Sequence, residues 1–218
     1  WGSFAAAYYS GGVASGKTSF VRHLVASSRA IQSFSSDAAV ADLLGQEAVL
    51  QRLVGRFGPQ VLSEDGVLDK AKLRDVVFAD ETARLDLEAI LHPLVFKSLE
   101  QAKLQAANGG VKVLVAEVPL FYETGGTFKP DLVVLVAARS SLQMQRMMTE
   151  RGLDAKAADG VIQAQWPLDK KLVFADVVIW NEGSPALLQM QAAVLSKQLL
   201  DKMCIEQLEG APETGTTA

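Results

Sequence analysis

Five short apolar runs lie along the chain, separated by longer segments in which apolar residues recur three or four positions apart. The runs are continuous rather than alternating, as expected for strands that are covered on both faces. They are Phe4–Ser10, Ile31–Ser35, Val111–Val118, Leu132–Ala137 and Val177–Trp180. Strands that alternate with helices predict an α/β fold with a parallel sheet.

The segments between these runs predict helices at Thr18–Ser27, Ala38–Phe57 (as one or two helices), Asp69–Ala79, Glu81–Ala107, Leu142–Arg151, Lys156–Gln165 and Ser184–Leu208. Asp69 and Ser184 are residue types that cap helix N-termini, and Pro185 suits a first helical position. The stretch between the second and third strands is too long for one crossover helix and predicts a helical satellite. The segment 209–218, rich in Gly, Pro and Thr, predicts a frayed tail.

The first apolar run leads into a match to the phosphate-loop pattern G-x-x-x-x-G-K-[ST], and a predicted helix follows it. The loop is Gly11, Gly12, Val13, Ala14, Ser15, Gly16, Lys17 and Thr18, with Ser19 next. Its glycines allow backbone N–H groups to turn inward around an anion, and the helix N-terminus adds positive potential. We expect Lys17 to contact the β/γ-phosphates of ATP as a catalytic cation, and the Thr18 hydroxyl to ligate Mg²⁺. A chance glycine-rich turn is the alternative, which the strand–loop–helix context disfavours.

The composition restricts the class of protein to which the chain can belong. The 218 residues are 49% hydrophobic, which suits a folded core, and the formal net charge of −4 argues against a broad nucleic-acid-binding face. No apolar run reaches the roughly 18 residues of a membrane span. The single cysteine, Cys204, favours a reducing compartment. We therefore expect a cytoplasmic protein that binds a small molecule, without nucleic acid, membrane or an obligate protein partner.

Short motifs follow the loop in a fixed order: Ser35-Ser36-Asp37, Phe57-Gly58, Gly66-Val67-Leu68-Asp69-Lys70 with Leu73 and Val77-Phe78, Leu91-His92-Pro93, Val118-Pro119-Leu120-Phe121-Tyr122-Glu123, Gln165, Lys171 and Ala175–Ser184. In this order and spacing, over residues 10–208, the chain resembles the dephospho-CoA kinases, which use ATP to phosphorylate the ribose 3′-hydroxyl of dephospho-CoA. Three positions depart from the family pattern. Ser35 replaces the first acid of a D-x-D element, Lys70 replaces an arginine, and Ala14 stands where glycine is frequent.

The resemblance implies a three-layer P-loop fold with a five-stranded parallel sheet in the order 2-3-1-4-5. The nucleotide-binding core would comprise residues 1–42, 109–140 and 175–208. Residues 43–108 would form a helical insertion that binds the CoA substrate, and residues 141–174 a lid.

Two carboxylates are placed at the phosphate crevice by this sheet order, because each ends a strand beside the P-loop strand. Asp37 is the candidate base for the 3′-hydroxyl, and it would also contact the substrate. A helix N-cap is the alternative for Asp37. Glu117 is a candidate Mg²⁺ ligand through water, with a buried pairing role as the alternative.

Further candidates rest on the resemblance. Arg146, Arg151, Asn181 and Gly183 are expected near the nucleotide, with a solvated helix face or a capping turn as the alternatives. Lys70, Arg74, His92 and Pro119 are expected to contact the substrate, with structural or surface roles as the alternatives.

Two other functions remain open from the sequence. One is a nucleoside or nucleotide monophosphate kinase of the same fold, which the His-Pro helix and the late Ala175–Ser184 motif disfavour. The other is a non-catalytic nucleotide switch, which Asp37, Lys17 and Thr18 disfavour.

Overall fold

The computed structural model describes residues 4–117 and 130–209, with side chains described up to Lys202. It divides into two compact units, which we call the core unit (residues 1–34 and 103–218) and the helical unit (residues 35–102). The predicted insertion, residues 43–108, begins and ends later than the helical unit. Among the described residues no helix is long and apolar enough to cross a membrane.

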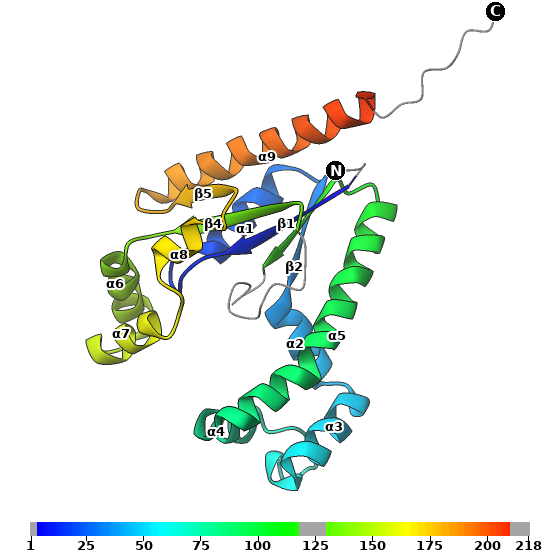
Figure 1. The fold of residues 1–218 in the computed structure, drawn as a ribbon, viewed down its shortest axis with the longest axis vertical. Coiled ribbons are helices and arrows are strands. Elements are labelled where there is room, and N and C mark those ends of the chain that lie inside the picture. Colours follow the sequence, from blue (N-terminus) through cyan, green and yellow to red (C-terminus); the bar gives the residue numbers. More distant parts are fainter. Residues whose placement is uncertain (1–3, 118–129, 210–218) are drawn as a thin grey trace, which may run out of the picture. The chain divides into compact units, whose positions relative to one another are not determined.

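The core unit is built on one five-stranded sheet (Figure 1). Its strands are β1 (Ala5–Ser10), β2 (Ile31–Ser35, which ends at the first residue of the helical unit), β3 (Val113–Glu117), β4 (Leu132–Ala137) and β5 (Val177–Trp180). Their order is β2-β3-β1-β4-β5, and β1 pairs in parallel with both β3 and β4. The predicted α/β fold and the order 2-3-1-4-5 are confirmed.

Both faces of β1 are buried, which explains its continuous apolar run. Ala5, Ala7 and Tyr9 belong to a core cluster that α1 (Lys17–Ser27) and α9 (Pro185–Glu209) complete on one face. On the other face the Nζ of Lys103, near the end of α5 (Glu81–Asn108), lies 5.8 Å from the Tyr8 ring centroid. The carboxyl end of β1 is thereby fixed where the phosphate loop begins.

Three further helices of the core unit lie between β4 and β5: α6 (Ser140–Arg151), α7 (Ala155–Gln163) and α8 (Leu168–Leu172). The first two match predicted helices, whereas α8 was not predicted because five residues are too few to show a helical period. Ser184 caps α9 as expected, because its Oγ accepts a hydrogen bond from Leu187 N at 3.3 Å.

The helical unit contains α2 (Ser36–Leu44), α3 (Glu47–Phe57), the short 3₁₀ helix η1 (Pro59–Val61), α4 (Lys70–Ala79) and most of α5. The segment Ala38–Phe57 therefore forms two helices. Leu53 and Val61 are fully buried in the apolar core of the helical unit, and Leu73 of α4 packs into the same cluster. The α5 helix runs through His92 and Pro93.

Candidate active site

The phosphate loop follows β1 and ends at α1, as the motif predicts. Gly16 is the N-cap of α1, with a φ of 93°, a conformation that glycine adopts without steric cost. A Cβ at Gly16 would lie 2.1 Å from Nδ2 of Asn181, so the absent side chain also makes room for that amide. At Gly12 a Cβ would similarly meet the Gln143 side chain at 2.5 Å.

The Lys17 ammonium is held over the loop by the loop's own backbone. Its Nζ donates to the carbonyl oxygens of Gly11 and Gly12, each at 2.9 Å. The cation is thereby positioned at the start of the loop. This arrangement is compatible with a role in which Lys17 faces the terminal phosphates of a nucleotide.

Thr18 and Glu117, which are 99 positions apart in the sequence, are brought together at this edge of the sheet. The Thr18 hydroxyl donates to Oε1 of Glu117 over 3.4 Å, and Glu117 is the last residue of β3. A hydroxyl and a carboxylate are hard oxygen ligands of the kind that Mg²⁺ prefers. Within the described residues no group of three or more His, Cys, Asp or Glu residues forms a metal cluster. Water and the oxygens of a bound phosphate could complete the coordination of a metal here.

Arg146 and Asn181 both contact the loop backbone. Arg146, on α6, donates to the carbonyl oxygens of Ala14 at 3.0 Å and of Asn181 at 2.9 Å. Nδ2 of Asn181, which directly follows β5, donates to Ser15 O at 2.8 Å. The solvated-face alternative is wrong for Arg146 because its guanidinium is anchored on the loop. Arg151, in the last turn of α6, and Gly183 are exposed.

Two glutamines that lie at the loop were not among the site residues predicted from the sequence. Oε1 of Gln165 accepts a hydrogen bond from Val13 N at 3.0 Å. The buried Gln143 donates from Nε2 to Ala138 O at 3.0 Å and fills the space left by Gly12. Gln165 was visible as a motif residue, and Gln143 precedes Arg146 by three positions, which places both on one face of a helix.

An ion pair lies beside Asn181. Arg139 donates from its backbone N to Oε1 of Glu182 at 2.8 Å, and from Nε to Oε2 at 2.9 Å. These hydrogen bonds hold the pKa of Glu182 below its usual value. The pair joins the end of β4 to the residue that follows Asn181, and so fixes the chain beside the loop.

In the helical unit, Asp37 lies in the first turn of α2 and is exposed. The N-cap of this helix is Ser35, whose Oγ accepts a hydrogen bond from Ala38 N at 3.3 Å. The alternative in which Asp37 is the N-cap is therefore wrong. Ser35 is a good capping residue, as the family's acid would be at the same position.

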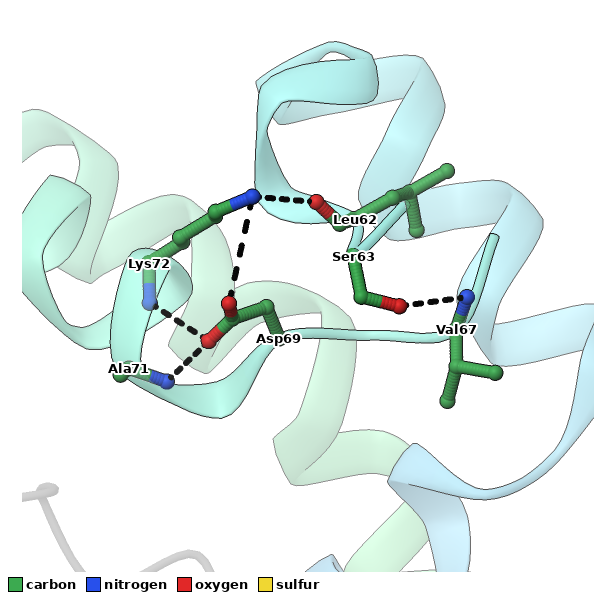
Figure 2. Close-up of polar contacts among 6 residues, drawn as sticks. All are labelled: Leu62, Ser63, Val67, Asp69, Ala71 and Lys72. Carbon is green, nitrogen blue, oxygen red and sulfur yellow. Dashed lines mark hydrogen bonds and ion pairs between the residues drawn. The ribbon is translucent and has the colours of Figure 1, made fainter. Parts of the chain in front are cut away.

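Lys70 is the first residue of α4, directly after the predicted cap Asp69. Oδ1 of Asp69 accepts hydrogen bonds from the backbone N of Ala71 at 2.9 Å and of Lys72 at 3.1 Å (Figure 2). Lys72 also donates from Nζ to Leu62 O at 2.8 Å. Lys70 and Arg74 are exposed, and Arg74 makes an ion pair with Asp75 over 3.7 Å.

His92 is half-buried on α5, with its ring centroid 6.1 Å from that of Phe96. The helix continues through Pro93, as the predicted helix Glu81–Ala107 implies. Pro119, the remaining candidate for substrate contact, lies outside the described residues.

Comparisons with known proteins point to one family. A family model described as dephospho-CoA kinase matches residues 8–186. A dephospho-CoA kinase of Syntrophotalea carbinolica is 35% identical over 193 residues, which cover 88% of this chain and 91% of the relative. A crystal structure from Thermus thermophilus superposes with a TM-score of 0.74 at 27% identity, covering 89% of this chain and 97% of the other. The dephospho-CoA kinase structure from Campylobacter jejuni, at 24% identity and a TM-score of 0.61, shares the fold and covers 90% of this chain and 98% of the other.

Proposed function

This chain belongs to the dephospho-CoA kinase family, and we propose which of its residues carry out the phosphorylation of dephospho-CoA by ATP. The observation that carries the proposal is the convergence of Lys17, Thr18 and Glu117 at the carboxyl ends of β1 and β3. In a parallel α/β sheet, ligands bind outside the carboxyl ends of the strands.

The nucleotide would lie in the loop from Gly11 to Ser19, with its phosphates against the backbone N–H groups and the N-terminus of α1. Lys17 would leave the carbonyl oxygens of Gly11 and Gly12, or share its three donors with them, to contact the β- and γ-phosphates. Negative charge grows on these oxygens as the phosphoryl group leaves, so a fixed cation lowers the barrier. Arg146, Arg151, Asn181 and Gly183 would form the rest of the nucleotide site.

Thr18 and Glu117 fit a Mg²⁺ ion, because their oxygens already lie beside each other at the loop. When bound, Mg²⁺ would neutralise charge on the phosphate oxygens and orient them. Thr18 would be a direct ligand, and Glu117 would accept hydrogen bonds from metal-bound water. Both residues therefore position the group that is transferred.

Asp37 is the proposed base. It follows the end of β2 by two residues, and capping of α2 is supplied by Ser35, so capping does not account for an acid at this position. A carboxylate beside the 3′-hydroxyl would orient that nucleophile and accept its proton as the O–P bond forms. Transfer to the 3′-hydroxyl would be favoured over hydrolysis of ATP once the bound substrate displaces water from the site.

The acceptor would be recognised by Lys70, Arg74, His92 and Pro119. Lys70 and Arg74 lie one helical turn apart on α4 and are exposed, so both cations are available to an anionic substrate. The lysine presents a compact charge rather than a planar fork, and it would contact one phosphate oxygen at a time. We place the reaction in the cytoplasm, where ATP is supplied.

A panel of acceptors tests the function. The purified chain would be given Mg-ATP with dephospho-CoA, AMP, adenosine or pantothenate, and ADP formation would be followed for each. We expect rapid turnover only when the acceptor is dephospho-CoA. Phosphorus NMR should show that the product carries the new phosphate on the 3′-hydroxyl. Faster turnover with AMP or adenosine, or ATP hydrolysis independent of acceptor, would contradict the proposal.

A further inference from the structure

Ala14, in the middle of the phosphate loop, has a φ of 53°. It is the one non-glycine residue with a positive φ in the part of the chain that the structure describes. The left-handed region crowds the Cβ of an alanine against its own backbone, which disfavours this conformation by roughly 5- to 30-fold in population. Something must therefore hold the loop in this shape.

Three side chains from distant parts of the chain contact three consecutive residues of the loop at this position. Oε1 of Gln165 accepts from Val13 N at 3.0 Å, Arg146 donates to Ala14 O at 3.0 Å, and Asn181 donates to Ser15 O at 2.8 Å. Arg146 also donates to Asn181 O at 2.9 Å, which links two of the three. All of these groups belong to the core unit.

The contacts lie on both sides of the strained residue. One partner fixes the N–H of Val13, and two others fix the carbonyl groups of Ala14 and Ser15. A change of φ at Ala14 to a negative value would therefore break at least one of these hydrogen bonds. The Asn181 side chain is itself fixed, because Asn181 is buried and its backbone N donates to Ala137 O at 2.8 Å. The three partners thus oppose the relaxation that alanine favours.

We propose that Gln165 is a positioning residue for the phosphate loop, which acts with Arg146 and Asn181 to hold Ala14 in its left-handed conformation and so keeps the loop shaped for nucleotide. This inference rests on the proposed nucleotide site. Gln165 itself need not contact the nucleotide, because it acts through the Val13 N–H. A loop that reaches the binding shape only part of the time binds its ligand more weakly in proportion to the missing fraction.

A double-mutant cycle between Gln165→Ala and Ala14→Gly tests the inference, with the KM for ATP and kcat at saturating dephospho-CoA as readouts. Glycine adopts a positive φ without cost, so Ala14→Gly removes the bias that Gln165 opposes. We expect Gln165→Ala to raise the KM for ATP about five-fold in the wild-type background, the lower end of the population bias. In the Ala14→Gly background, Gln165→Ala should raise the KM for ATP less than two-fold. The effect of Gln165→Ala on kcat should be small in both backgrounds.

Gln163→Ala is the matched control, since Gln163 is the exposed last residue of α7 and undergoes the same chemical change. It should leave the KM for ATP unaltered. If Gln165→Ala does not fold, Gln165→Met keeps the length of the side chain and removes the acceptor oxygen, and the cycle is repeated with it. An equal rise in KM in both backgrounds, or no rise in either, would overturn the inference.

Lys17→Ala separates this inference from the proposed function. If Lys17→Ala is inactive while the cycle shows no coupling, the nucleotide site stands and the role of Gln165 is refuted. If Lys17→Ala retains normal turnover, the nucleotide site is misplaced and both proposals fail.

Discussion

The phosphate loop and the helical unit hold their polar residues in different ways. At the loop, side chains 132 to 166 positions away in the sequence contact consecutive backbone groups. In the helical unit the contacts of Asp69 reach Ala71 and Lys72, and the Arg84 guanidinium pairs with Glu81 and Glu88 on its own helix. The polar contacts that shape the loop therefore come from distant parts of the chain, whereas these polar contacts of the helical unit are local in sequence.

This difference bears on how the two substrates are handled. A loop held by distant partners can present its N–H groups to phosphate before the nucleotide arrives, and such preorganisation lowers the cost of binding. The candidate acceptor residues Lys70 and Arg74 instead lie on an exposed helix face. We therefore expect the acceptor site to take its final arrangement when dephospho-CoA binds.

The largest expected effect is that of Lys17→Ala. The loop contacts of Arg146, Gln165 and Asn181 do not involve the lysine side chain, so the fold should persist. Loss of the cation should lower kcat by about 10²–10³-fold, as loss of one donor to a developing negative charge does elsewhere. Steady-state kinetics and a thermal melt measure the two properties together. Lys197→Ala, an exposed site on α9, is the control for loss of charge and should remain active.

Asp37→Asn should come next, with a loss of kcat of roughly 10²-fold and little change in the KM for ATP. Phosphoryl transfer proceeds through a loose transition state with limited proton transfer, which favours the lower end of the range for a general base. Because Ser35 caps α2, the thermal stability should not change. Asp42→Asn, exposed on the same helix, is the matched control. A folded Asp37→Asn protein with more than about half of the wild-type kcat would exclude Asp37 as the base.

The same contrast explains what the sequence could predict. The strands, the loop motif and the cap Asp69 depend on local pattern, and they were predicted close to their observed positions. The pairing of Thr18 with Glu117 was also accessible, because sheet order brings the ends of β1 and β3 to one edge. Gln165 received no role, because its contact with Val13 spans 152 positions and leaves no local signature. The left-handed φ of Ala14 was not predicted, because alanine itself gives no sign of it; the only indication was that glycine is frequent at this position in the family.

Asp69→Ala tests whether the helical unit is stabilised locally. Removal of an N-cap that accepts two backbone hydrogen bonds should cost about 1 kcal/mol, because the N–H groups of Ala71 and Lys72 lose their partner (Figure 2). Hydrogen exchange should speed up in α4 while the phosphate loop and β1 remain unchanged. Asp69→Asn should be nearly neutral, since asparagine caps as well as aspartate, and Asp65→Ala controls for an exposed acid of the same turn. Faster exchange throughout the core unit would contradict a local effect.

In the core unit, Tyr9→Phe should change stability by a similar amount and in the opposite direction. The Tyr9 ring is fully buried against Phe20, at a centroid distance of 5.7 Å, and its hydroxyl has no hydrogen-bond partner among the described residues. Phenylalanine keeps the ring packing and removes the unsatisfied group, so we expect a gain of about 1 kcal/mol, or a Tm higher by roughly 2–4 °C.

The pH dependence of this gain distinguishes burial of the hydroxyl from a general packing effect. Burial raises the pKa of Tyr9 above its usual value, so the folded chain keeps this proton at a pH where the unfolded chain releases it. The unfolded state then binds fewer protons, and the free energy of unfolding of the wild type falls with pH above about 10, by up to about 1.4 kcal/mol per pH unit from this group. Below pH 10 both states hold the proton, so the difference between Tyr9→Phe and wild type should be constant there and should widen above it. Urea unfolding at pH 8 and pH 10.5 measures both values, and other ionising groups cancel because the two proteins share them. Two results would contradict this expectation: a variant less stable than wild type at pH 8, or a stability difference that does not widen at pH 10.5. Either would mean that the Tyr9 hydroxyl is stabilised in the folded chain, in an interior more polar than its burial indicates.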